Sequence, residues 1–168
     1  DLTIILLLLD TGIRLGELCR LNISDVNLET GEGYIAPFGN SNRKTKSRIV
    51  NIGKGTKRVV WRYLVNRIET EPKDPLLITE RGERRITPNS VRLLLADLGR
   101  KAGLSECHPH KFRHTFCIEF LRNDGDVFNL QLLTGHSSLD MLKTYLQIAR
   151  GDTAKAHKKA SPVDNWKL

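Results

Sequence analysis

The sequence predicts a mainly α-helical domain that carries one small antiparallel β-sheet, an α+β arrangement. Apolar residues recur at helical spacing along most of the chain, whereas β-branched, strand-like runs gather between residues 34 and 52. Because strands do not alternate with helices along the chain, a doubly wound α/β fold is disfavoured. The 168 residues, of which 39% are hydrophobic, suffice for a core without disulfides or a structural metal.

The first half of the chain is predicted to contain helices and a β-hairpin. An apolar run at the start ends near Thr11-Gly12, and a helical pattern returns after this pair. The turn-rich stretch Gly39–Asn42 separates two strand-like runs and is followed by basic residues. The expected helices are Leu2–Leu9, Leu15–Leu21 and Thr56–Ile68, and the expected strands are Tyr34–Phe38, Arg48–Ile52 and Leu76–Ile78.

The second half is predicted to be helical. Thr87 is placed to cap a helix whose first residue is Pro88, and Gly103 follows the end of that helix. The stretch Asn123–Asp126 interrupts the next helical pattern. The expected helices are Pro88–Lys101, His110–Arg122, Val127–Leu133 and Leu139–Ala149, and a polar, basic tail begins at Gly151.

Basic residues dominate the region around the predicted hairpin. The net charge of the chain is +8, and no Asp or Glu occurs from Gly33 to Ile68. Such a block favours a polyanion, either nucleic acid or an anionic membrane surface, although a solubilising face is the alternative interpretation. We expect double-stranded DNA to be the partner, contacted by Arg43, Lys46, Arg48, Lys54 and Lys57.

The cysteines and the apolar start of the chain indicate where the protein works. Cys19, Cys107 and Cys117 are odd in number and irregularly spaced, which argues against disulfides and indicates a reducing compartment. The run Ile4–Leu9 is too short to span a bilayer and lacks the features of a signal peptide. We therefore expect a cytoplasmic, nucleoid-associated protein with no membrane role. Because the chain begins inside a predicted helix, we also expect it to be a fragment.

A segment rich in histidine and arginine opens the predicted helix at residue 110. His110 and Arg113 are three residues apart and share one helix face, where an imidazole and a planar guanidinium suit a phosphate. Taken alone, a helix-start histidine beside a surface arginine is the simpler interpretation. A zinc site is disfavoured, because His110 and His114 have the spacing of a metal pair but nothing completes four ligands.

Two other short segments contain polar residues that need explaining. Arg14 follows an apolar helix and a glycine turn, and a buried arginine there needs a partner such as Glu17 or a bound phosphate. Gly135 fits a helix end before His136, and Tyr145 lies about two turns into the next helix. In isolation, this tyrosine would be interpreted as ordinary packing.

Together these segments resemble the tyrosine recombinase (phage integrase) family over nearly the whole chain. Thr11–Leu18 is similar to the first box of the family, His110–His114 to its HxxRH motif, and Leu133–His136 followed by Tyr145 to its last box. No single box is specific, but the boxes occur in the family's order with a basic hairpin between them. The resemblance implies a catalytic domain at residues 1–150 and a site-specific DNA recombinase.

The resemblance also implies the central chemistry. Arg14 and Arg113 would grip the scissile phosphate and stabilise the negative charge of the transition state. Tyr145 would attack phosphorus, leaving a 3′-phosphotyrosyl bond and a free 5′-hydroxyl, so that rejoining needs no ATP. No metal, cofactor or small-molecule substrate is implied. The absence of an evident carboxylate cluster argues against a two-metal nuclease or transposase.

Further site residues follow from the same resemblance. His110 would act as an acid or base near the tyrosine, and His136 would donate a hydrogen bond to a phosphate oxygen. A hairpin lysine would protonate the leaving 5′-oxygen; Lys44 is the first choice and Lys46 the second. Thr134 stands where glycine or a leucine–glycine pair is commoner in the family, and we expect this difference to have little effect.

The two ends of the chain carry their own expectations. From the resemblance, we expect the N-terminal DNA-clamp domain of the family to be absent from this chain. The tail, residues 151–168, is either a segment that docks onto a neighbouring protomer or a frayed basic end. In the first case, Ala154–Ala160 would be helical, with Val163 and Trp166 as apolar anchors. The resemblance implies a tetramer on two DNA duplexes.

Two alternative functions remain open. A type IB topoisomerase uses the same tyrosine chemistry but relaxes supercoils as a monomer; the compact hairpin and the His136-to-Tyr145 spacing favour the recombinase. A DNA-binding regulator whose catalysis has decayed is the other possibility. The presence of all the expected catalytic residue types argues against it.

Overall fold

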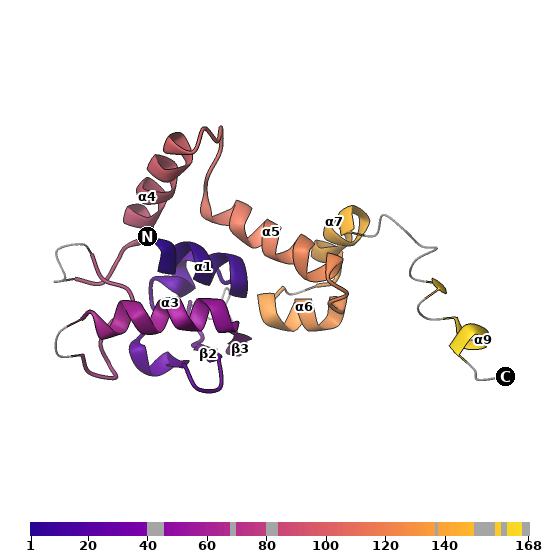
Figure 1. Ribbon diagram of the computed structural model, residues 1–168, viewed down its shortest axis with the longest axis horizontal. Coiled ribbons are helices and arrows are strands. Elements are labelled where there is room, and N and C mark those ends of the chain that lie inside the picture. Colours follow the sequence, from indigo (N-terminus) through magenta and orange to yellow (C-terminus); the bar gives the residue numbers. More distant parts are fainter. Residues whose placement is uncertain are drawn as a thin grey trace.

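The computed structural model describes residues 1–39, 46–67, 70–79, 84–136, 138–149, 157–158 and 161–165. Over these residues the protein is mainly helical with one three-stranded antiparallel sheet, which confirms the predicted fold class (Figure 1). The helices are α1 (Leu2–Thr11), α2 (Leu15–Leu18), α3 (Lys54–Val65), α4 (Pro88–Lys101), α5 (Pro109–Arg122), α6 (Val127–Thr134), α7 (Asp140–Ala149) and α9 (Pro162–Asn165). The strands are β1 (Val26–Asn27), β2 (Glu32–Ile35) and β3 (Arg48–Asn51), and η1 (Ile23–Asp25) is a 3-10 helix.

The sheet is built around β2, which pairs with β1 on one side and with β3 on the other. Tyr34 of β2 lies opposite Ile49 of β3. The predicted strand Tyr34–Phe38 begins earlier than expected and ends at Ile35. The sequence does not predict β1, because a strand of two residues is too short to show an alternating pattern.

The predicted strand Leu76–Ile78 is wrong. Ile78 forms only an isolated bridge with Arg85, while the two leucines of the segment are buried in the core. A short apolar run reports burial, and it does not distinguish a strand from any other buried segment.

The larger core cluster surrounds α1, which is apolar along most of its length. Ile4, Leu7 and Leu8 are at most 5% exposed, and α1 contacts both α3 and α5 (Figure 1). A helix this apolar is stable only when neighbouring elements cover it. Its packing therefore places the turn after its C-terminal end beside α5.

A smaller core cluster lies between α5, α6 and α7. Its buried members are Phe116, Cys117, Leu130, Leu142 and Tyr145. Because α5 also contacts α1, this helix connects the two halves of the molecule (Figure 1). Tyr145 is thus positioned by a packed helix rather than by a loop.

Glycines end the two helices that lead into the predicted motifs. Gly12 follows α1 and Gly135 follows α6, both in the left-handed conformation with φ of 59° and 66°. A residue with a Cβ is strained in this conformation, whereas glycine is not. These glycines set the direction in which the chain continues toward Arg14 and His136.

Replacing Gly12 by alanine is expected to destabilise the fold by about 2–4 kcal/mol, through backbone strain and overpacking. The added Cβ would lie 2.2 Å from the Phe116 ring, which is itself packed in the smaller core cluster. Urea denaturation measures the loss. Gly55→Ala is the matched control, because nothing lies within 4 Å of a Cβ there. A helical alanine at that exposed position is expected to be neutral or stabilising.

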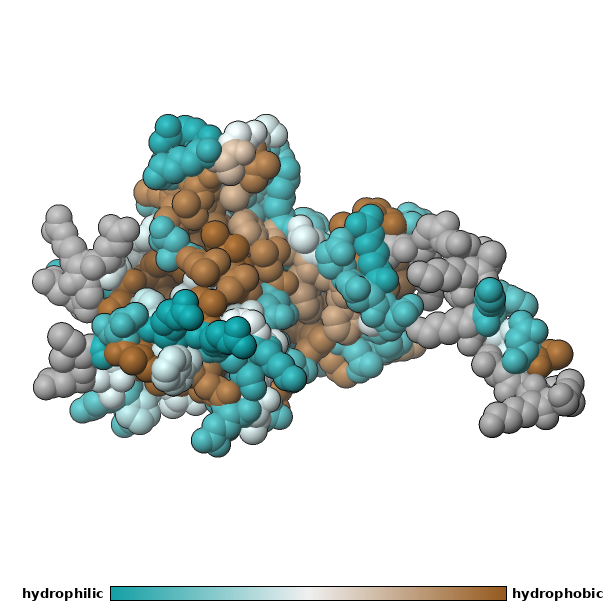
Figure 2. All heavy atoms as spheres, in the orientation of Figure 1, coloured by the Kyte–Doolittle hydropathy of each residue, from teal (hydrophilic) through white to brown (hydrophobic). Residues whose placement is uncertain are grey.

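The surface keeps several large apolar side chains. Figure 2 shows apolar surface, in brown, where α4 approaches α1 and α5. Leu2 of α1 and Trp61 of α3 are each 57% exposed, and Leu93 of α4 is 64% exposed. None of the helices in the described ranges is long and apolar enough to cross a membrane.

Candidate active site

Arg113 lies one turn into α5 and points into the protein, where it is 7% exposed. Its Nη1 donates to the Gly12 carbonyl at 2.5 Å, and its Nη2 donates to the Thr134 carbonyl at 2.8 Å and to His136 Nε2 at 3.0 Å. Burial, followed by the charge of Arg14, lowers the pKa of Arg113 to about 10. The side chain therefore remains a cation at neutral pH, bonded to neutral acceptors.

Arg14 enters the site from the turn between α1 and α2. Its backbone N–H donates to Glu17 Oε2 at 2.8 Å, and its Nη1 lies 3.2 Å from Glu17 Oε1. Its Nη2 donates to the Gly135 carbonyl at 3.0 Å. The contact with Glu17 confirms one of the two partners expected for Arg14. Because the Arg14 side chain is 37% exposed, it is anchored and still accessible to a ligand from solvent.

Arg48 is a buried member of the same network rather than a surface residue. Its Nη1 and Nη2 donate to the two Glu17 oxygens at 2.8 and 2.7 Å, and its Nε donates to the Leu133 carbonyl at 2.7 Å. The side chain is only 8% exposed. In the structure this guanidinium joins β3 to α2 and α6, and the contact of Arg48 with DNA stays a prediction.

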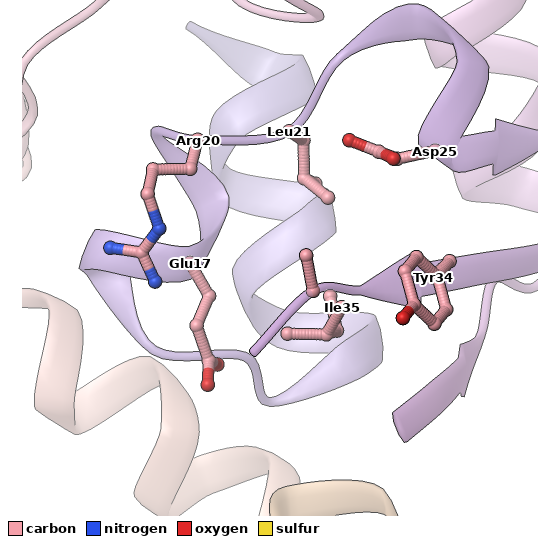
Figure 3. A pocket seen from close by; sticks show the side chains of 7 residues that line it. Glu17, Arg20, Leu21, Asp25, Tyr34 and Ile35 are labelled. Carbon is pink, nitrogen blue, oxygen red and sulfur yellow. The ribbon is translucent and has the colours of Figure 1, made fainter. Parts of the chain in front are cut away.

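Glu17 is the carboxylate that holds these arginines. Figure 3 shows its side chain on α2, directed away from Asp25 and Tyr34, which line the same pocket. Burial alone would raise the pKa of Glu17. The hydrogen bonds from Arg48 and from the Arg14 backbone, together with both arginine charges, outweigh burial and lower this pKa to about 2. Glu17 is therefore ionised throughout the neutral range.

His136 is held in one orientation from both sides of its ring. Its Nδ1 lies 2.9 Å from Thr134 Oγ1, and its Nε2 lies 3.0 Å from Arg113 Nη2. Because arginine can only donate, Nε2 accepts and Nδ1 carries the proton. Burial, then the charges of Arg113, Arg14 and Arg48, lower the pKa of His136 to about 4. To donate to a phosphate, Nε2 must exchange its bond with Arg113 for a proton.

Thr134 is a site residue whose importance the sequence does not reveal. It is fully buried, and its hydroxyl donates to the Leu130 carbonyl at 2.6 Å while accepting from His136 Nδ1. The expectation that Thr134 has little effect stays a prediction; in the structure its hydroxyl accepts the proton on His136 Nδ1 and so fixes the tautomer of that ring. Its only sequence signal is its place two residues before that histidine.

Thr134→Val should lower the free energy of unfolding by about 1–3 kcal/mol, because the buried Nδ1–H of His136 loses its acceptor. Valine has nearly the same shape as threonine, so packing contributes little. Thr134→Ser keeps the hydroxyl and is expected to lose less. Equal losses in urea denaturation for both variants would show that the hydroxyl is unimportant.

Tyr145 completes the cluster from α7. Its ring stacks against His136 with 6.4 Å between centroids, and its hydroxyl lies 2.5 Å from His114 Nδ1. Burial, then the neighbouring Cys117, raises the pKa of Tyr145 despite the opposing charge of Arg113. The phenol is therefore protonated at neutral pH.

The structure thus brings Arg14, Arg113, His136 and Tyr145 together, as the motifs predict. His110 is exposed, and its described ring contact is an edge contact with His108 at 6.4 Å.

Comparison with known proteins accounts for this arrangement. The model described as the phage integrase family matches residues 1–151. The chain belongs to this family. Tyrosine recombinase XerC of Actinobacillus pleuropneumoniae is 33% identical over 163 residues, which cover 96% of this chain and 52% of that protein. Tyrosine recombinase XerA of Pyrococcus furiosus is 30% identical over 165 residues, covering 98% and 56%. The chain therefore spans about half the length of these curated relatives.

Solved structures of phage integrase family proteins share the fold. The crystal structure of XerA recombinase superposes with a TM-score of 0.73 at 30% identity, covering 95% of this chain and 54% of that one. The catalytic domain of bacteriophage HP1 integrase gives 0.67 at 22%, covering 97% and 83%. The Tn1549 transposon integrase in complex with circular intermediate DNA gives 0.74 at 23%, covering 94% and 58%. The last two similarities concern the fold alone.

The predicted basic surface of this phage integrase domain is described only in part. Arg43 and Lys44 lie outside the described residues. Lys46 is exposed before β3, and Lys54 is exposed at the first residue of α3. The Lys57 ammonium donates to a backbone carbonyl between β1 and β2 at 3.0 Å. The choice between Lys44 and Lys46 as the hairpin acid stays a prediction.

No group of three or more His, Cys, Asp or Glu side chains is placed to hold a metal ion among the residues described. Cys19, Cys107 and Cys117 are free cysteines. Burial raises the pKa of the Cys19 and Cys117 thiols to about 11. These two thiols are therefore protonated packing groups in this phage integrase domain.

Proposed function

We propose that this chain is the catalytic domain of a site-specific DNA recombinase, which cleaves and rejoins DNA through a 3′-phosphotyrosyl bond at Tyr145. The proposal takes double-stranded DNA as the substrate and needs neither metal nor cofactor. It is supported by relatives named tyrosine recombinases and by the Tn1549 integrase, which was solved with DNA. The proposed setting is the cytoplasm, at the nucleoid.

The observation that carries the proposal is the charge balance beside Tyr145. Arg14, Arg48 and Arg113 carry three positive charges, against which Glu17 supplies one negative charge. Positive charge therefore remains uncompensated where the Arg113 charge acts on Tyr145. Donors fixed before the reaction stabilise a phosphoryl transition state without reorganising.

The arginines and the tyrosine divide the reaction between them. Tyr145 Oη forms a bond to phosphorus as the bond to the 5′-oxygen breaks. Arg113 and Arg14 then stabilise the charge on the non-bridging oxygens. Because Arg113 already bonds to two carbonyls, its orientation is fixed before DNA arrives. Attack of a 5′-hydroxyl on the phosphotyrosyl bond reverses the step and rejoins the strand.

The remaining roles concern protons and hydrogen bonds. His136 donates to a non-bridging oxygen once phosphate has replaced Arg113 at its Nε2. His110 serves as an acid or base close to the same phosphate. Lys44, or Lys46 in its place, gives a proton to the 5′-oxygen as it leaves.

Two alternatives have less support. The names of the relatives favour recombination over the relaxation of supercoils by a type IB topoisomerase. A purely DNA-binding regulator would not need a tyrosine hydroxyl beside a buried cationic cluster.

We also propose that residues 1–150 form the catalytic unit and that residues 151–168 dock onto a neighbouring protomer, within four protomers on two duplexes. Val163 is 58% exposed and available for such a contact. Trp166 and most of Ala154–Ala160 lie outside the described residues.

Covalent trapping on nicked DNA tests the reaction class. The protein is incubated without divalent metal on nicked duplexes, from which cleavage releases a short strand that diffuses away, so that rejoining cannot occur. The protein–DNA adducts are then digested with a protease and mapped by mass spectrometry. The chain has three tyrosines, and the mapping shows which of them carries the DNA. DNA attached at Tyr145 is expected. Attachment elsewhere, or free cleaved DNA without an adduct, would contradict the proposal.

A further inference from the structure

Tyr145 must lose a proton at the moment of attack. Its hydroxyl is protonated at neutral pH, because burial raises a pKa that is already about 10 in an unperturbed phenol. In the described bonds, none of the three side chains proposed to contact the phosphate, Arg14, Arg113 and His136, is bonded to this hydroxyl. A proton acceptor within hydrogen-bond distance is therefore required.

One side chain in the described residues meets this requirement. His114 follows Arg113 directly on α5, so Arg113 points inward while His114 lies on the adjoining flank, toward α7. Its Nδ1 is 2.5 Å from Tyr145 Oη, and the two rings lie 5.4 Å apart between centroids. No contact between His110 and Tyr145 is found in these ranges; the His110 ring contacts His108.

We infer that His114 is the catalytic base that activates Tyr145. As Tyr145 Oη bonds to phosphorus, its proton passes to His114 Nδ1, while the leaving 5′-oxygen takes a separate proton from the proposed hairpin lysine. During rejoining, the 5′-hydroxyl attacks phosphorus and returns its proton to the hairpin lysine, while the proton on His114 passes back to the departing Tyr145 oxygen. This inference rests on the proposed function and names a residue that the motif roles leave unused.

The surroundings of His114 keep its imidazole neutral before the reaction. Burial, then the neighbouring His110, His108 and Arg113, lowers the pKa of His114 below its usual value. A neutral imidazole whose Nδ1 accepts from the phenol has its other proton on Nε2. The base is therefore already in its accepting form when DNA binds.

Single-turnover cleavage by two His114 variants tests the inference. His114→Ala removes the acceptor, whereas His114→Asn places an amide near Nδ1 that can bond to the hydroxyl but cannot take its proton. Both variants are expected to form the Tyr145 adduct on the order of 10²-fold more slowly, the lower range for general acid–base catalysis. Glu119→Gln, at a half-exposed carboxylate on the same helix outside the site, is the control. Circular dichroism and DNA binding check that the variants are folded.

A modified substrate separates this role from protonation of the leaving group. A 5′-bridging phosphorothiolate carries a sulfur leaving group that needs no proton. The His114 variants are expected to remain slow on this substrate.

Three results would overturn the inference. The first is a rate of adduct formation in His114→Ala equal to that of the wild type. The second is a wild-type rate in His114→Asn, which would show that His114 only positions the hydroxyl. The third is a wild-type rate of the His114 variants on the phosphorothiolate substrate, which would assign His114 to protonation of the leaving group. Failure of the proposed function itself is distinct, because the wild-type protein would then form no adduct at Tyr145.

Discussion

Tyr145→Phe is expected to abolish the covalent DNA adduct completely while leaving DNA binding and the fold intact. The substitution removes only the hydroxyl, which is the atom that attacks phosphorus. The ring keeps its place in the cluster with Phe116, Cys117, Leu130 and Leu142. Losing the bond to His114 should cost about 1 kcal/mol of stability. Denaturing gels after incubation with nicked DNA measure the adduct, and gel-shift titration measures binding.

Tyr63→Phe is the matched control for this experiment. Its hydroxyl accepts the Ile78 backbone N–H at 3.2 Å and takes no part in the described bonds of the arginine cluster. This variant should form the adduct at the wild-type level. An adduct that persists in Tyr145→Phe would overturn the choice of nucleophile, and a loss of binding would show that the hydroxyl is needed to hold DNA.

Glu17→Gln is the second substitution with a large expected effect, in this case on stability. Glu17 is 3% exposed and accepts both nitrogens of the buried Arg48 guanidinium. A neutral amide leaves that cation buried without a counter-charge, and breaking a buried pair in this way costs about 3–5 kcal/mol. Cleavage should also slow on the order of 10²-fold, because Arg14 loses the carboxylate that positions it. Urea denaturation and single-turnover cleavage measure the two effects.

The pH dependence of stability provides a separate test of the same carboxylate. The pKa of Glu17 is about 2 in the folded protein, whereas a glutamate without these partners has a pKa of 4.5. The unfolded state therefore binds more protons between these values, and stability falls as the pH falls from 4.5 toward 2. The wild-type protein should lose about 3 kcal/mol from this group over that window.

In Glu17→Gln this part of the loss should be missing. Glu119→Gln is the control, because its pair with Arg122 is about half exposed on both sides and such pairs contribute at most about 1 kcal/mol. Equal effects of the two substitutions would contradict the buried-network interpretation.

The long helices and the cationic residues of the site follow from the sequence. These helices are marked by local signals: the periodicity of α3, the Thr87 cap of α4 and the glycine ends of α1 and α6. Such signals depend only on residues close in the sequence, so they can be read before the fold is known. Arg14, Arg113, His136 and Tyr145 are found because their spacing matches a known set of motifs. The structure adds the contacts that hold them in place.

Other features depend on contacts between distant segments and cannot be read locally. Arg48 belongs to a basic block in the sequence, yet it pairs with Glu17, which lies 31 residues away. The hydroxyl of Thr134 matters only because His136 turns back toward it. Likewise, the bond between His114 and Tyr145 joins residues 31 positions apart on different helices. Each case requires knowing which helices pack together.

The bonds of Arg113 have a consequence for how such a domain can change over evolutionary time. Its guanidinium ties α5 to the end of α1 through Gly12 and to the end of α6 through Thr134. A descendant that no longer cut DNA would still need this arginine in order to assemble its helices. The presence of this arginine in a sequence is therefore weak evidence that the protein is an active enzyme. Tyr145 is the better indicator of activity, because its hydroxyl has no bond to the backbone of another segment among the described bonds.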